Sequence, residues 1–106
     1  MSSGCKVGAM SLAQSFEEFS AEHRAQGFDE VLKRHWPALT ELATHEHEFQ
    51  AKALVVDGEM WLSGGAQTHH LRAGSTFELD ARLPHAERYG SEGATYWVAR
   101  RHRPLD

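Results

Sequence analysis

The stretch LATHEHEFQAKALVVDG, residues 42–58, carries the pattern from which the fold is predicted. Apolar residues recur at every second position over residues 49–55, the period of a strand with one buried face. The segment 42–56 is therefore expected to form either a pair of strands or one long bent strand. Asp57-Gly58 then predicts a hairpin turn, because an Asp-Gly pair readily adopts the positive φ angles of a two-residue turn.

Short strand-like segments between turns continue on both sides of this stretch. Upstream, residues 31–36 form a candidate strand that ends before Pro37. Downstream, further strand candidates cover residues 59–62, 68–71, 76–79, 85–89 and 94–100. Seven or eight short strands at this spacing predict an all-β sandwich or barrel. A parallel α/β fold is excluded, because no helical crossover lies between the strands.

The N-terminal quarter of the chain has a different pattern. Residues 1–10 are small and polar and are expected to be a mobile lead-in. Residues 11–26 predict one helix, since two pairs have the spacing of a capping box, Ser11 with Gln14 and Ser15 with Glu18. Phe16 follows the cap and shares the apolar face of this helix.

Length, composition and charge limit the classes of protein to be considered. A chain of 106 residues fits one domain, with a lead-in and helix over 1–27 and a barrel over 28–106. The net charge of −4 disfavours binding to nucleic acid. One cysteine, Cys5, excludes a disulfide framework and a cysteine-based metal cluster. Without an apolar run of membrane-spanning length or a signal peptide, we expect a cytoplasmic protein that does not bind membranes.

Two of the eight histidines have the spacing of metal ligands. His45 and His47 flank one residue in a strand-like segment, so both imidazoles are expected on one face, about 7 Å apart along the strand. From there both could reach one metal ion at about 2.0–2.2 Å. The alternative is a pair of exposed strand histidines, because this composition produces roughly 0.6 such pairs by chance.

The other histidines differ in what their positions allow. His85 follows Pro84 at the start of a strand, and in a closed barrel it can face the first pair across the interior. His69 and His70 point to opposite faces, and His69, on the face of Leu71, is a further candidate for the site. The remaining three are expected at the surface: His23, His35 and His102.

This order of features resembles the cupin family of small jelly-roll barrels. The first cupin motif reads G-x5-H-x-H-x3,4-E-x6-G, and His45, His47 and Gly58 match it. The second reads G-x5-P-x-G-x2-H-x3-N, and Gly74 and His85 match it. The resemblance implies a double-stranded β-helix barrel, similar to RmlC-like cupins, with a divalent transition metal (Fe, Mn, Ni or Zn) held by the three matching histidines.

The sequence also departs from the family motifs within the region of resemblance, about residues 31–98. Leu39 stands in place of the first glycine, and Ala51 replaces the usual glutamate. The proline, second glycine and asparagine of the second motif are replaced by Asp80, Arg82 and Tyr89. Three neutral imidazoles would leave a divalent ion with its full charge and two or three open positions. Glu48 and Gln50 lie near but face away by alternation.

Glu87 and His69 are the candidate catalytic groups for acid–base chemistry. Glu87 shares the face of His85 and could approach the metal or orient a ligand. The alternative for Glu87 is an outward ion pair with Arg88 or Arg72. Four aromatic residues are candidates for pocket walls or for ordinary core packing: Trp61, Phe77, Tyr96 and Trp97.

Three functions follow from these observations. The first is a metalloenzyme of the dioxygenase, isomerase or lyase type, in which a small oxygen-rich substrate chelates the metal. Some cupin dioxygenases have a three-histidine iron centre without glutamate, and the sequence is similar in that respect. The second is a non-catalytic cupin that binds or senses a sugar or other metabolite. The third is a metal-free structural barrel. Similar small cupins are commonly homodimers, and the apolar segment 31–36 could pair with a second copy.

Overall fold

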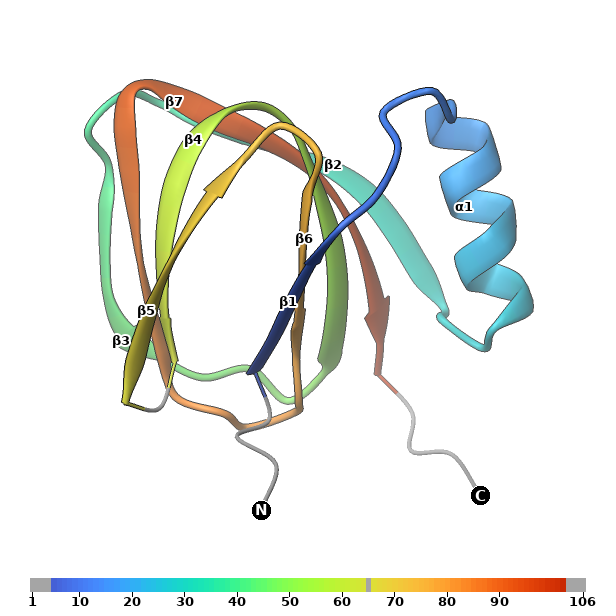
Figure 1. Ribbon diagram of the computed structural model, residues 1–106. Helices are drawn as coiled ribbons and strands as arrows, with labels where there is room; N and C mark the ends of the chain where they lie inside the picture. Colours follow the sequence, from blue (N-terminus) through green and yellow to red (C-terminus); the bar gives the residue numbers. More distant parts are fainter. Residues whose placement is uncertain (1–4, 65, 103–106) are drawn as a thin grey trace.

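The computed structural model describes residues 5–64 and 66–102, which form one helix and seven strands (Figure 1). This confirms the all-β class with one N-terminal helix. In chain order the elements are β1 (Cys5–Ala9), α1 (Phe16–Ala25), β2 (Glu30–Trp36), β3 (Glu41–His45), β4 (Gln50–Gly64), β5 (Gln67–Arg72), β6 (Ser75–Leu79) and β7 (His85–Arg101).

The strands form one antiparallel sheet built around the two longest strands. The sheet order is β1-β6-β4-β7-β2, with β3 added to β7 and β5 added to β4. Figure 1 shows β4 and β7 curving strongly, so that the sheet closes around an interior. Alternate residues of both strands fill this interior, which makes it the main core: Ala51, Ala53, Val55, Met60 and Leu62 from β4, and Tyr89, Ala94, Tyr96 and Val98 from β7.

The hairpin predicted at Asp57-Gly58 is wrong. Both residues lie within β4, where the pairing with β7 shifts register on either side of Gly58. Gly58 has φ +82°, and a Cβ there would lie 2.1 Å from the Gly93 carbonyl oxygen. A positive φ serves a bulge as well as a turn, so this glycine bends the strand instead of reversing it. On the facing strand, the two segments predicted over 85–89 and 94–100 are likewise one strand, β7.

The mobile lead-in predicted over residues 1–10 is wrong for residues 5–9. These residues form β1, which pairs with β6 from Cys5 opposite Leu79 to Ala9 opposite Ser75. The segment is short and contains a glycine, and the edge of β6 supplies the hydrogen bonds that order it. Residues 1–4 lie outside the described residues.

The helix α1 begins at Phe16, five residues later than expected, and packs against the outside of the barrel (Figure 1). The predicted capping box is present: the Glu18 backbone N–H donates to Ser15 Oγ at 3.1 Å, and the Ser15 backbone N–H donates to Glu18 Oε1 at 2.8 Å. Phe19 is buried beneath the helix, with its ring 5.7 Å from that of Trp97. Among the described residues, no helix has the length and apolar character to cross a membrane.

The histidine of this helix, His23, was expected at the surface but is only 3% exposed. It follows Phe19 by one turn and therefore faces the barrel with it. Its Nδ1 lies 2.8 Å from the Phe19 carbonyl oxygen and donates to it, because a carbonyl can only accept. Its ring also lies 5.7 Å from that of Phe28. His23 is thus a packing residue of the helix–barrel contact.

We expect Ser15→Ala to destabilise the protein by about 1 kcal/mol, because it removes the side-chain acceptor of the cap. This corresponds to a melting temperature lower by about 4–8 °C. Thermal unfolding followed by circular dichroism tests it, with the exposed Ser91→Ala as the control. An equal effect of both substitutions would contradict the role of the cap.

Candidate metal centre

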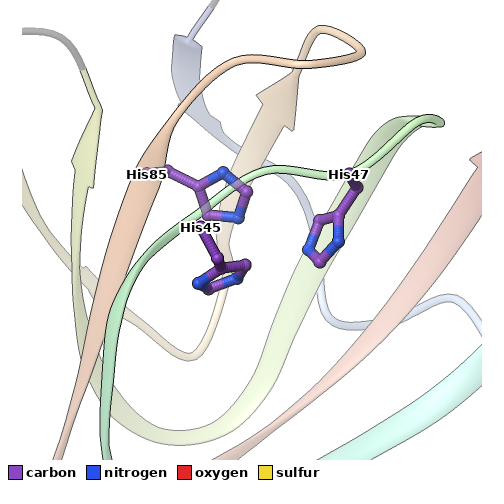
Figure 2. A group of neighbouring side chains, drawn as sticks. All are labelled: His45, His47 and His85. Atoms are coloured by element: carbon purple, nitrogen blue, oxygen red, sulfur yellow. The ribbon is translucent and has the colours of Figure 1, made fainter.

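Three histidines come together where β3 ends and β7 begins (Figure 2). His45 is the last residue of β3 and lies directly opposite His85, the first residue of β7. His47 follows β3 by two residues. One ring nitrogen from each histidine lies within 4.8 Å of the corresponding nitrogens of the other two. The three side chains therefore converge on a common point.

The structure brings the predicted residues together by a different route from the one expected. The segment 42–56 contains the end of one strand, a connection and the start of a second strand. His47 lies in the connection, so of the first pair only His45 is within a strand. His85 is on the neighbouring strand of the same sheet and does not face the pair across the interior. The pairing of β3 with β7 is irregular between Leu42 and His45.

Backbone hydrogen bonds orient two of the imidazoles. His45 Nδ1 lies 2.7 Å from the Ala43 carbonyl oxygen, and His85 Nδ1 lies 2.8 Å from the Leu83 carbonyl oxygen. A carbonyl oxygen can only accept, so each Nδ1 carries the proton. In a neutral imidazole of this tautomer the lone pair is on Nε2, the atom through which histidine would then bind a metal.

The third imidazole, that of His47, is held by stacking. Its ring is nearly parallel to that of Phe49, with centroids 4.6 Å apart and an interplanar angle of 8°. Burial lowers the pKa of His47 to about 4, helped by the charges of the neighbouring histidines and of Arg100 and Arg34. His47 is therefore neutral at neutral pH, with a lone pair available.

Glu87 lies beside the histidines and does not form the outward ion pair with Arg88 or Arg72 that was its alternative. Its side chain is 8% exposed, and Oε2 lies 3.4 Å from His45 Nε2 and 3.8 Å from His85 Nε2. The Tyr89 hydroxyl donates a short hydrogen bond to the other oxygen, Oε1. The expected partner Arg88 instead places its guanidinium over the Trp61 ring, 4.1 Å from the centroid.

Tyr89 is fixed as the donor in this pair. Burial raises the pKa of its hydroxyl, and the nearby Tyr96 and Glu87 raise it further. The hydroxyl therefore keeps its proton and holds the Glu87 carboxylate in one orientation.

The donor atoms in this group are of the kinds that bind a metal ion, and they lie close to one another. Nε2 of His45 and Nε2 of His85 both lie near one carboxylate oxygen of Glu87, at 3.4 and 3.8 Å. His85 Nε2 is buried and has no hydrogen-bond partner among the described residues. A cation between these atoms would satisfy the lone pairs and the carboxylate together. Three imidazoles and a nearby carboxylate fit a divalent transition metal.

The remaining histidines stay apart from this group. His69 lies on β5 opposite Leu62 and is not one of the three clustered histidines, so its catalytic role stays a prediction. His70 stacks on the Trp61 ring with an interplanar angle of 7°. Besides His23, two histidines were expected at the surface, and both are exposed and hydrogen-bonded: His35 to Thr95 and His102 to Glu30.

A pocket of about 410 Å³ opens beside the site, and His45, His47 and Glu87 contribute to its lining. Four other side chains that line it come from β2 and β7: Arg34, Trp36, Tyr96 and Arg100. Sequence reasoning missed the two arginines, although each lies two positions from an apolar residue and therefore on the same face of its strand: Arg34 from Leu32 and Trp36, and Arg100 from Val98. A smaller cavity of about 30 Å³ beside His85 includes Ala51 and Phe77 in its lining.

Of the aromatic residues considered as pocket walls, Trp61 lines a second pocket, of about 610 Å³, together with Glu87 and Arg88. Trp61 stacks on His70 and Arg88, away from the core cluster. Trp97 packs against Phe16 and Phe19 of α1. Tyr96 and Phe77 lie in the core, with their rings 5.5 Å apart.

Comparison with known proteins identifies the fold through solved structures alone. No protein-family model matches the chain, and no match is found among curated proteins. Among solved structures, an RmlC-like cupin from Shewanella frigidimarina NCIMB 400 aligns over 97% of this chain and 81% of its own, with 17% identity and a TM-score of 0.59. The chain has the cupin fold.

Two enzymes also resemble this cupin. A chain from the crystal structures of the DMSP lyases RdDddP and RnDddQII is 25% identical over 67% of this chain, with a TM-score of 0.63. Salicylate 1,2-dioxygenase from Pseudaminobacter salicylatoxidans is 17% identical over 65%, with a TM-score of 0.58. The 106-residue chain covers only 37% of the lyase chain and 20% of the dioxygenase chain.

Proposed function

We propose that this cupin binds one divalent transition metal ion through His45, His47 and His85 and acts on a small oxygen-rich organic substrate. The observation that carries the proposal is the environment of His85 Nε2. This atom is buried, has no hydrogen-bond partner among the described residues and lies 3.8 Å from Glu87 Oε2. Such an arrangement is costly without a cation and favourable with one.

The chain's own residues divide the work at this centre. His45 and His85 are oriented by backbone carbonyl groups, and His47 is kept neutral by burial. Glu87 supplies the negative charge that Ala51 does not, and it does so from β7 instead of β4. When bound, a metal of this type polarises a substrate oxygen or activates O₂.

The reaction is proposed to be of the dioxygenase, isomerase or lyase type. The structural likeness to a chain named as a lyase and to one named as a dioxygenase supports this range. Glu87 is the carboxylate placed to take up or return a proton beside the bound substrate. Oxygen uptake and product analysis with diketones, thiols and hydroxy acids would distinguish turnover from binding alone. The homodimer and the cytoplasmic location stay predictions.

Metal content tests the proposal directly. We expect the protein, purified without a histidine tag, stripped with chelator and reconstituted with Fe(II), Mn(II), Ni(II) or Zn(II), to hold about one ion per chain. Inductively coupled plasma mass spectrometry after desalting gives the occupancy. An occupancy below a tenth with all four metals would overturn the proposal.

A further inference from the structure

Two arginines occupy inward-facing positions in the barrel. On β2, Leu32 and Trp36 pack against the main core, and Arg34 lies between them on the same face. On β7, Arg100 continues the buried alternation that includes Val98. Charged side chains are rare on the inner face of a small barrel unless they are paired or bind something.

The side chain of Arg34 has no polar partner among the described residues. No hydrogen bond or ion pair involves its guanidinium within that part of the chain, and its ordered contact is with an aromatic ring. The guanidinium carbon lies 4.9 Å from the centroid of the Trp36 ring. This stacking fixes the position of the group and leaves its N–H donors unused.

Arg100 is only partly paired. Its Nη1 lies 3.5 Å from Glu30 Oε1, an oxygen that also lies 2.9 Å from His102 Nε2. Its Nε is buried and has no hydrogen-bond partner among the described residues. The guanidinium lies over the Phe49 ring, 4.7 Å from the centroid. A ligand that enters the pocket could supply the acceptor that this buried donor lacks among the described residues.

The two arginines line the same pocket as His45 and His47. The carboxylates of this pocket belong to Glu41, which is exposed, and Glu87, which is bonded to Tyr89. Neither carboxylate forms an ion pair with either arginine within the described residues. The pocket is therefore lined by one guanidinium without an ion-pair partner among the described residues, that of Arg34, and by one that is paired only with Glu30, that of Arg100.

We propose that Arg34 and Arg100 bind the carboxylate of a small organic substrate, which makes a small carboxylic acid the substrate class of this pocket. The planar guanidinium matches a carboxylate by two parallel hydrogen bonds. Trp36 and Tyr96 provide apolar contact for the carbon skeleton, and about 410 Å³ suits a small ligand. The inference rests on the proposed metal centre only for the substrate's second contact, an oxygen that reaches the histidines.

Isothermal titration with matched probes tests the assignment. The probes are lactate, mandelate, the neutral analogue mandelamide and inorganic phosphate, each added to the metal-reconstituted protein. We expect lactate or mandelate to bind, and mandelamide to bind at least about tenfold more weakly than mandelate. No measurable binding of either acid, equal binding of acid and amide, or tighter binding of phosphate than of both acids would overturn the proposal.

Variants assign the effect to the two arginines. Arg34→Gln and Arg100→Gln should each weaken binding of the acid by about tenfold to a hundredfold, while Arg88→Gln, on the outer face, should leave it unchanged. Arg100→Lys keeps the charge without the fork and should bind with intermediate affinity. Arg34→Gln removes no hydrogen bond or ion pair among the described residues, only the stacking on Trp36. It is therefore expected to fold even if Arg100→Gln does not. Unchanged affinity in Arg34→Gln would overturn the proposal.

Metal content separates this inference from the proposed function. Both glutamine variants should retain the metal occupancy of the parent protein, because neither arginine is a metal ligand. If the parent protein binds no metal but still binds the acid through Arg34, the metal proposal fails and the carboxylate site stands. If metal is bound but the acid is not, the carboxylate site fails alone.

Discussion

His85→Ala is expected to weaken Zn(II) binding by at least about a hundredfold. The substitution removes one of three converging imidazoles, and even residues that only support metal ligands typically contribute tenfold to a hundredfold. His85 is 3% exposed and its Nδ1 is fixed by the Leu83 carbonyl, and among the described residues no fourth histidine belongs to the group. Competition titration against a chromophoric chelator measures the change.

Two further variants make the His85 result interpretable. His47→Ala removes a half-buried ligand with less effect on packing, and it should also lose the metal if His85→Ala proves unstable. His70→Ala removes a histidine that stacks on Trp61 outside the group and should bind Zn(II) like the parent protein. Full metal occupancy in His47→Ala would contradict a centre built from these three histidines.

Ala51→Glu is expected to destabilise the metal-free protein by about 3–5 kcal/mol, because it buries a carboxylate without a partner. Ala51 is 4% exposed and lies in the main core, beside the cavity that His85 and Glu87 also line. A second negative charge next to Glu87 adds repulsion to the loss of hydration. The melting temperature should fall by more than about 10 °C.

Added metal should reverse much of this loss. With Zn(II) or Fe(II) present, the new carboxylate can ligate the ion, so binding energy stabilises the folded state. The same ligand would occupy an open position and reduce activity that depends on chelation or O₂. Ala51→Gln has nearly the same size without the charge and should recover less. Melting curves of both variants with and without metal decide the matter, and a drop in Ala51→Glu that metal does not reverse would contradict the centre.

Local patterns in the sequence predicted a large part of the fold and of the candidate site. The strand expected over residues 31–36 corresponds to β2, and the capping box of Ser15 and Glu18 is present. Both depend on residues within a few positions of one another. The three histidines were found because two lie two positions apart and the third follows a proline corner. Such signals survive because they are short-range.

Other features could not be predicted because the same local signal is compatible with two structures. The positive φ that Asp57-Gly58 allows suits a hairpin turn or a bulge. Here the pairing with β7 continues on both sides of Gly58, so the strand does not reverse. The Gly93 carbonyl on β7 leaves room only for a glycine at this position. Residues 5–9 likewise alternate apolar residues with Lys6 and Gly8, but five residues of this composition suit a lead-in or a strand, and the edge of β6 decides for the strand.

The amino-acid sequence by itself determined the all-β class, the strand period and the identity of the three clustered histidines. Only the tertiary structure decided that Glu87 faces them and that Arg34 and Arg100 enter their pocket. Alternation states which residues share a face of a strand, but not which strands become neighbours. That choice depends on the burial of the whole sheet, in which β3 lies beside β7 and places His45 opposite His85.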